Sequence, residues 1–223
     1  MNILAIDAST EYCSAALWVD GAVSQRVAAA GQAHSEQLLA MIDAVMAEGG
    51  AGLSTLDGIA YGQGPGSFTG LRVACAVAQG LAFPAGIPVA GIGTLHAMAL
   101  ACAAPRVVCC LDARMREVYH ATYEQADGVL IESSAPRVCA PDAAPPLRGT
   151  GWSGCGSGFR VYGDTLRRIY YSQLGAVAPG IYPRAAEMAR LAAPVFAAGR
   201  GVPAEGAVPL YVRDKVALKT AER

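Results

Sequence analysis

The sequence contains few of the residue patterns that build common catalytic and metal sites. Its three histidines, His34, His96 and His120, are far apart, and none has a second histidine four positions away. Its seven cysteines include no C-x-x-C pair. The chain also lacks the G-x-S-x-G sequence of a serine hydrolase and the Lys-Ser/Thr ending of a Walker P-loop. The residues therefore give no support to zinc, serine-hydrolase or Walker-type NTPase chemistry.

Charge is also scarce, and it is unevenly distributed. Charged residues make up 16% of the chain, which has a formal net charge of −1. Residues 1–105 contain two basic and seven acidic residues, whereas residues 106–223 contain 15 basic and 11 acidic residues. A net charge this small excludes a strong overall attraction to nucleic acid or to anionic membranes. A hydrophobic content of 53% excludes intrinsic disorder in a chain of 223 residues.

One long uncharged stretch raises the possibility of a membrane span. No formally charged residue occurs from Val73 to Pro105, but Gly and Pro residues interrupt this segment repeatedly. A span needs about 20 predominantly apolar residues in one element, so we expect a buried helix, strand and helix instead. Met1–Asp7 lacks a basic region, so we expect no signal peptide. The odd number of cysteines among apolar neighbours then favours reduced thiols and a cytoplasmic location.

Each half of the chain shows a meander of strands followed by helices. The pattern thus predicts an α/β protein of two related lobes, residues 1–104 and 105–223, with a tail from about residue 208 that can return to the first lobe. In the second half, residues 149–158 are rich in glycine and predict a flexible loop. The predicted strands are residues 2–7, 13–20, 22–29, 56–63, 88–91, 107–113, 117–125 and 129–138. The predicted helices are residues 35–48, 67–83 (stopped by Pro84), 94–103, 160–172 and 184–198.

Two helices of the first lobe carry unusual apolar patterns. Large apolar residues of the helix at 35–48 cover an arc of about 160°, wider than the roughly 100° that faces a single core. This helix is either deeply buried in its own lobe or packs against both its lobe and a partner, and the residues alone leave both alternatives open. In the next helix, small residues recur every fourth position and allow another helix to approach closely. These small residues are Gly70, Ala74, Ala78 and Ala82.

Two turns have the composition of an anion-binding site. Asp7, Ser9 and Thr10 follow the first strand, where hydroxyls and backbone N–H groups can hold a phosphate and a carboxylate can hold hydrated Mg²⁺. The alternative is an Asp and two hydroxyls that only satisfy a turn. Gly64–Gly70 opens a helix, whose free N–H groups favour anions, although Ser67 can serve simply as its N-cap.

Several segments together resemble one known family along nearly the whole chain. These are ILAIDAST (3–10), HSEQLLAMID (34–43), GQGPGSFTGLRVACAVAQGLA (62–82), LDARMREVY (111–119), YPRA (182–185) and PLYVRDKVALK (209–219). The sequence resembles the TsaB (YeaZ) family, non-catalytic partner subunits of the bacterial machinery for N6-threonylcarbamoyladenosine modification of tRNA. The resemblance implies a fold of two lobes, each a mixed sheet flanked by helices, similar to the actin, Hsp70 and sugar kinase superfamily.

The catalytic relatives in this superfamily carry a His-x-x-x-His metal pair, and this sequence departs from it. The matching positions are Thr94 and Met98, and a hydroxyl and a thioether do not replace two imidazoles. His96 lies between them and faces away on a helix, so we expect it to be structural. The resemblance thus implies no catalytic residue, no metal ligand and no cofactor in this chain, with Asp7, Ser9 and Thr10 as a degenerate phosphate loop.

The implied function is that of a scaffold. The subunit would bind and orient the catalytic threonylcarbamoyl transferase subunit as a heterodimer, help recruit a small ATPase subunit, and meet tRNA only through the complex. In isolation we expect a homodimer through the same surface. The alternatives are an ATP-dependent kinase or transferase that uses the phosphate loop, and a peptidase, against which the missing metal ligands argue. The expected partner interface comprises Leu38, Leu39, Met41, Ile42, Val45, Met46, Gly70, Leu71, Ala74, Ala78 and Ala82.

Overall fold

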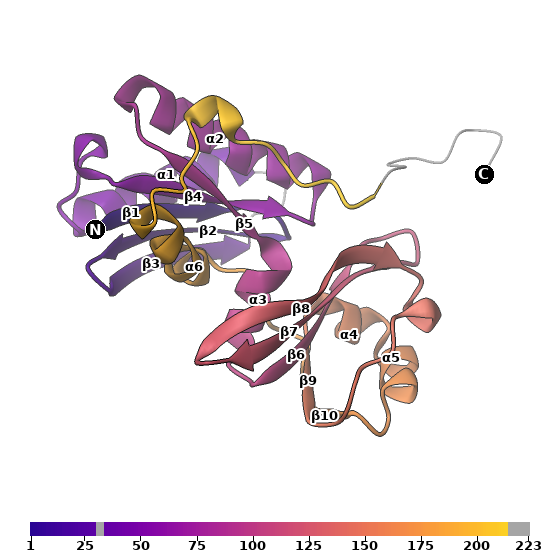
Figure 1. Cartoon of the computed structure of the whole chain (residues 1–223). Helices are drawn as coiled ribbons and strands as arrows, with labels where there is room; N and C mark the ends of the chain where they lie inside the picture. The colour runs from indigo at the N-terminus through magenta and orange to yellow at the C-terminus, as the bar shows by residue number, and fades with distance from the viewer. Residues whose placement is uncertain (30–33, 214–223) are drawn as a thin grey trace.

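The computed structural model describes residues 1–29 and 34–213 and divides them between two lobes, each built on a five-stranded sheet (Figure 1). The elements of the first lobe are β1 (Asn2–Asp7), β2 (Tyr12–Val19), β3 (Ala22–Ala29), α1 (His34–Glu48), β4 (Gly58–Gly64), α2 (Phe68–Ala85) and β5 (Val89–Gly93). Those of the second lobe are β6 (Arg106–Asp112), β7 (Val118–Ala126), β8 (Val129–Cys139), β9 (Trp152–Cys155), α4 (Ser157–Val161), α5 (Gly163–Ile169) and β10 (Leu174–Ala178). Two further helices, α3 (Thr94–Cys102) and α6 (Ala185–Ala197), link the lobes.

The first sheet has the strand order β3-β2-β1-β4-β5. β1, β2 and β3 form an antiparallel meander, and β4 and β5 add to β1 in parallel. β1 is buried on both faces, which explains why its sequence is a continuous apolar run rather than an alternating one. Helices cover both faces of this sheet.

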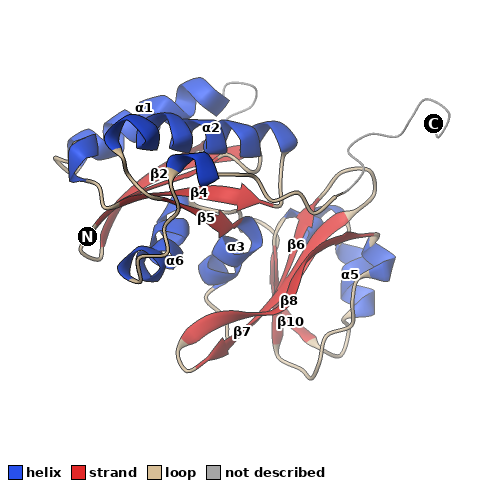
Figure 2. Cartoon of the chain, turned by 45° about the horizontal axis from the view of Figure 1, so that its top comes forward, coloured by secondary structure: helices blue, strands red, loops and turns tan. Residues whose placement is uncertain are grey.

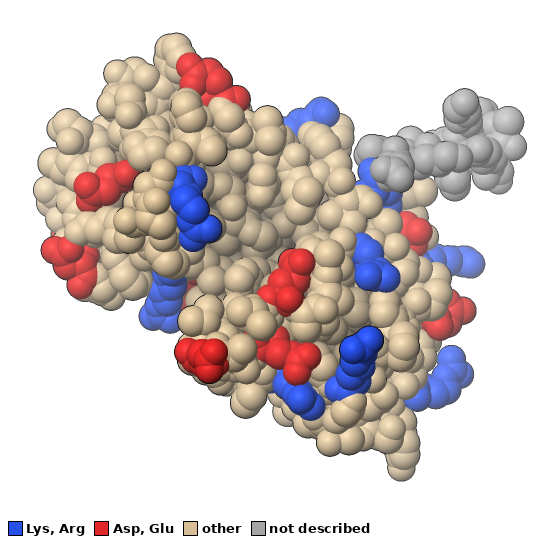
Figure 3. Space-filling view, in the orientation of Figure 1, with Lys and Arg blue, Asp and Glu red and all other residues tan. Residues whose placement is uncertain are grey.

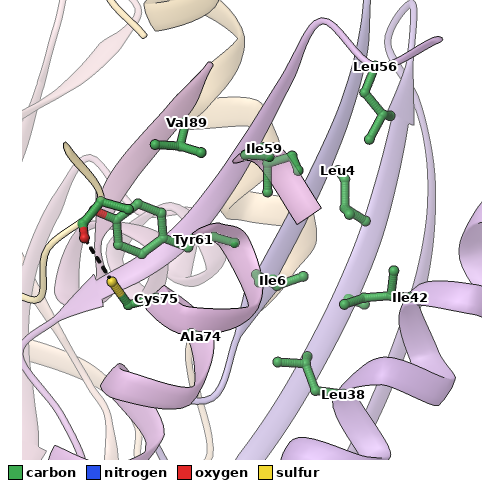
Figure 4. Packing of buried hydrophobic residues seen from close by; sticks show 14 of the residues in the cluster. Leu4, Ile6, Leu38, Ile42, Leu56, Ile59, Tyr61, Ala74, Cys75 and Val89 are labelled. Carbon is green, nitrogen blue, oxygen red and sulfur yellow. Dashed lines mark hydrogen bonds between the residues drawn. The ribbon is translucent and has the colours of Figure 1, made fainter. Parts of the chain in front are cut away.

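α1 and α2 cover one face of the first sheet (Figure 2). Leu4 and Ile6 of β1 point toward Leu38 and Ile42 of α1, while Ala74 of α2 lies over β4 (Figure 4). On the opposite face, Ile3 and Ala5 pack against α6. The alternation of β1 side chains therefore supplies two separate apolar layers from one strand.

The second sheet repeats the arrangement of the first. Its order, β10-β9-β6-β7-β8, again combines an antiparallel meander with two added parallel strands. The prediction of two α/β lobes with mixed sheets is thus confirmed.

Two helices, α3 and α6, each pack on the sheet of the lobe that they do not follow in the sequence. α3 follows β5 but packs much of its surface on the second sheet, where Leu95 and Met98 join the core formed with Cys109 and Tyr123. α6 follows β10 but packs on β1, β2 and β4 of the first lobe. The chain therefore returns to the first lobe at Ala185, earlier than the tail from residue 208 that the sequence predicts.

The predicted end of the long helix is wrong. α2 continues through Pro84 to Ala85 and is capped by Gly86, whose φ of 63° is in the left-handed region. Proline is tolerated here because it removes only one hydrogen bond, from the exposed last turn. Ser67 is the N-cap, and its side chain accepts a hydrogen bond from the Gly70 N–H. α2 is also the one helix in the described part of the chain that is long and apolar enough to cross a membrane, and one of its sides packs against the first sheet.

The glycine-rich segment at 149–158 is not a simple loop. It contains β9 and the start of α4, and Trp152 is buried while its indole N–H donates to the Arg148 carbonyl at 2.9 Å. A Cβ on Gly154 would lie 2.7 Å from the Phe159 ring, so glycine is required where the strand meets the helix. The single predicted helix at 160–172 is two short helices, and β10 was not predicted at all.

Candidate functional site

The turn after β1 is held together by its own side chains. Asp7 and Ser9 are buried, and both the N–H and the hydroxyl of Ser9 donate to Asp7 Oδ2, at 3.3 and 3.0 Å. The Ser67 N–H, just before α2, donates to the Ser9 carbonyl at 2.7 Å. The donors of Ser9 are thus used within the turn, which favours the structural alternative for this residue.

The other Asp7 oxygen has no such partner. Oδ1 is buried without a hydrogen bond, and a Cβ on Gly62 would lie 1.9 Å from it. Burial raises the pKa of the Asp7 carboxyl to about 7, although the hydrogen bonds from Ser9 oppose this shift. Glycine at position 62 is therefore required for Asp7 to fit beneath the turn.

A cleft of about 550 Å³ lies between the lobes, next to this turn. Ser9, Thr10 and Ser67 line it from the first lobe, and Asp112 and Ser157 line it from the second. Residues 210–213 form another wall. The structure therefore brings Ser9 and Thr10 together with the start of α2, a proximity that the sequence did not predict.

Each arginine that lines the cleft is paired with a carboxylate. Arg114 Nη1 lies 3.4 Å from Asp112 Oδ2, and Arg160 Nη2 lies 3.0 Å from Oε1 of Glu11 in the opposite lobe. Arg213 pairs with Glu117. On the face of the second lobe that Figure 3 shows, basic and acidic residues are interspersed instead of forming a field of one sign. These pairings weaken the attraction that the cleft would otherwise exert on a phosphate.

Thr94 and Met98, which the family resemblance places at the metal-ligand positions of catalytic relatives, both belong to α3. Thr94 is buried and its Oγ1 has no hydrogen-bond partner, while Met98 packs into the core of the second lobe. His96 stacks on Tyr123 with ring centroids 4.9 Å apart, and its Nε2 lies 3.1 Å from the Leu130 carbonyl oxygen. Burial lowers the pKa of His96. Within residues 1–29 and 34–213, no three His, Cys, Asp or Glu side chains are grouped as metal ligands.

The eleven residues expected at a partner interface fall mostly inside the first lobe. Leu39 is 47% exposed and Met41 is half-buried. The others are buried: Leu38, Ile42, Val45, Met46, Gly70, Leu71, Ala74, Ala78 and Ala82. The assignment of these nine to an outer surface needs correction, because the stripe of small residues lets α2 approach its own sheet. A Cβ on Gly70 would lie 1.8 Å from the Ala8 carbonyl oxygen. Whether α1 and α2 form a partner interface stays a prediction.

The outward faces of α1 and α2 carry a different set of residues. We call these the outer helical face, which consists of Leu39, Ala40, Ala44, Ala47, Ala76, Gly80 and Phe83. Phe83 is 66% exposed and lines a shallow groove of about 560 Å³ together with Ala76, Gly80 and Glu205. Sequence reasoning missed Phe83 because it assumed that the helix ended there. The spacing of Phe83 from Ala76 and Gly80 places all three on one side of a helix, and this spacing could have indicated the surface.

Known proteins are similar to this chain in sequence and in fold. Residues 27–151 match the family model described as TsaD, tRNA N6-adenosine threonylcarbamoyltransferase. The chain is 36% identical to the tRNA threonylcarbamoyladenosine biosynthesis protein TsaB of Escherichia coli K12, over 98% of this chain and 97% of that protein. It is 34% identical to the protein of the same name from Haemophilus influenzae, over 98% and 96%. YeaZ from Pseudomonas aeruginosa superposes with a TM-score of 0.86 at 35% identity, over 94% of this chain and 99% of that one. The chain therefore belongs to the TsaB (YeaZ) family of tRNA threonylcarbamoyladenosine biosynthesis proteins.

Proposed function

We propose that this protein is a non-catalytic scaffold subunit in the synthesis of threonylcarbamoyladenosine in tRNA. It binds and orients the catalytic threonylcarbamoyl transferase subunit in the cytoplasm and helps to recruit a small ATPase subunit. It meets tRNA only within that complex. The match to a transferase family model, combined with Thr94 and Met98 at the metal-ligand positions, supports a subunit that keeps the transferase fold without the metal chemistry.

The observation that carries the proposal is the outer helical face. The exposed Leu39 and Phe83 share the outward sides of α1 and α2 with exposed Ala and Gly residues and with Asp43, and the other sides of these long helices pack on the sheet. Small residues allow a partner helix to approach closely, while protruding apolar side chains supply the anchors of an interface. In the absence of the catalytic subunit, a second copy of this chain would cover the same face as an isologous dimer.

This surface can be tested by substitutions that place a charge outside the core. We expect Leu39→Glu and Phe83→Glu to reduce co-purification with the catalytic subunit by about tenfold or more, because each would desolvate a carboxylate in an apolar interface. The thermal unfolding of both variants should stay close to that of the wild type. Ala74→Glu is unsuitable as a test, since Ala74 is a core residue.

Val129→Glu is the matched control. Val129 is 62% exposed on β8 of the second lobe, so this variant adds the same charge at an exposed apolar residue in the lobe that lacks α1 and α2. It should retain the catalytic subunit. If Leu39→Glu and Phe83→Glu both retain it as well, the outer helical face is not the interface.

A further inference from the structure

The segment after a short 3-10 helix at Ala204–Gly206 crosses from the first lobe to the second. Figures 1 and 2 show residues 207–213 leaving the region of α2 and reaching the end of the second sheet. Residues 210–213 also line the cleft between the lobes. This segment is thus placed where it can control how far the lobes separate.

The first part of the segment is bound tightly to α2 and β4. The Ala207 carbonyl accepts hydrogen bonds from Cys75 Sγ at 3.0 Å and from Gln79 Nε2 at 2.9 Å, and the former is drawn as the dashed line in Figure 4. Val208 exchanges two hydrogen bonds with the Tyr61 hydroxyl, at 3.0 and 3.2 Å. The Leu210 N–H donates to the Gln63 carbonyl at 2.7 Å. These bonds make residues 207–210 an extension of the first lobe.

The next residue is held by an aromatic and cationic cluster. The Tyr211 hydroxyl accepts from Arg72 Nε at 3.0 Å, and its ring lies 5.7 Å from the Phe68 ring. The Arg72 guanidinium lies 3.6 Å from the centroid of the Phe68 ring. Because Phe68 and Arg72 both belong to α2, this cluster fixes the direction in which the segment leaves the helix.

The end of the segment binds the second lobe. Arg213 donates to Glu117 and to the Met115 sulfur, and its guanidinium lies 5.8 Å from the centroid of the Tyr119 ring. The Arg213 side chain is only 15% exposed. Arg213 is therefore mostly withdrawn from water, in contrast to a typical surface ion pair.

The turn that receives Arg213 has an uncommon backbone. Arg114, Met115 and Arg116 have φ values of 58°, 52° and 60°, and no other described residues form three consecutive non-glycine residues in this region. Such a conformation costs roughly 1–2 kcal/mol per residue and persists where surrounding contacts hold it. Hydrogen bonds from the Arg114 N–H to Asp112 and from the Glu117 N–H to the Arg114 carbonyl close the turn, and Arg213 contacts Met115 and Glu117.

We propose that residues 207–213 form a strap that sets the opening of the inter-lobe cleft, with the Arg213–Glu117 contact as its releasable end. At the first-lobe end, side chains and one carbonyl of α2 and β4 form several hydrogen bonds with the backbone of the strap, whereas the second-lobe end depends on the side chain of Arg213. Because the strap is bonded to Arg72, Cys75 and Gln79 of α2, it also connects the opening of the cleft to that helix.

The test uses the full chain with Arg213→Gln and Glu117→Gln, each checked by thermal unfolding. We expect amide hydrogen exchange in residues 113–117 and 211–213 to rise by about tenfold in each variant, because the contacts that order these segments are lost. Small-angle X-ray scattering should show a larger radius of gyration at the same oligomeric state. The double variant Arg213→Glu with Glu117→Arg should restore both measurements toward those of the wild type.

Arg106→Gln is the matched control, since Arg106 pairs with Glu124 at 3.0 Å within the second lobe. It should change neither the exchange of the strap nor the radius of gyration. If exchange rises in the two single variants but the radius stays constant, the strap does not set the cleft opening and the inference is wrong. The inference also fails if both measurements match those of the wild type.

Discussion

The two lobes use the same arrangement of strands, and each central strand ends in an aspartate. Asp7 ends β1 and Asp112 ends β6, and each carboxylate accepts a hydrogen bond from the backbone N–H two residues later. The surroundings differ, however. Asp7 is buried under Gly62 with one oxygen unpartnered, while Asp112 lies at the cleft and pairs with Arg114. The two sheets therefore place an aspartate at the same point of the fold, and the surrounding residues determine whether its carboxyl group is buried or paired with an arginine.

The helical layers of the two lobes differ even more. In the first lobe, α1 and α2 have 15 and 18 residues, and together they cover one face of the sheet. At the corresponding place in the second lobe, the chain has only a short 3-10 turn at 141–143 and then α4 and α5, with five and seven residues. Within residues 1–29 and 34–213, only the first lobe therefore offers a continuous helical surface for a partner, which is why the outer helical face is the basis of the proposed function.

The largest expected effect comes from the packing of α2. Gly70→Ala should lower the free energy of unfolding by about 3 kcal/mol, because the added methyl group would overlap the Ala8 carbonyl at the end of β1. Urea denaturation at neutral pH measures the change. Gly163→Ala in α5 of the second lobe is the control, because open space surrounds that position and the change should stay within about 0.5 kcal/mol. If the two variants lower the free energy of unfolding by equal amounts, the close contact between Gly70 and Ala8 is not the cause of the loss.

The next effect concerns Asp7 and pH. Its pKa is about 7 in the folded protein and 3.8 in the unfolded reference, so the unfolded state loses its proton first as pH rises. Stability contributed by the protonated carboxyl is therefore lost between about pH 4 and pH 7. Asp7→Asn, which stays neutral, should exceed the wild type in unfolding free energy by more than about 1 kcal/mol at pH 8. The difference should nearly vanish at pH 4 in urea denaturation, and a difference independent of pH would contradict the burial of an ionisable Asp7.

The sequence predicted those parts of the fold that depend on local patterns. The meanders of both lobes follow from apolar runs separated by Asp-Gly turns, such as Asp20-Gly21 and Asp127-Gly128, and the strands observed there lie within a few residues of those predicted. β10 was missed because its alternation is weak and it lies at a sheet edge. The sheet-facing direction of the Ala74 stripe and the Arg213–Glu117 contact were missed because both depend on segments distant in sequence. A stripe of small residues indicates close packing without indicating which surface provides the contact.

The smallest expected effect is in the aspartate of the second lobe. Asp112→Asn keeps an oxygen that can accept the Arg114 N–H, so the turn after β6 should persist, and the variant loses only the charge that pairs with the guanidinium. The Arg114 side chain is 84% exposed, so water and salt screen that pair, and its loss should cost less than about 1 kcal/mol. Urea denaturation in parallel with Asp7→Asn, at low and at physiological salt, measures the difference. A loss comparable to that of Gly70→Ala would mean that Asp112 organises the three-residue left-handed turn through its charge, and the two aspartates would then differ in role and not only in surroundings.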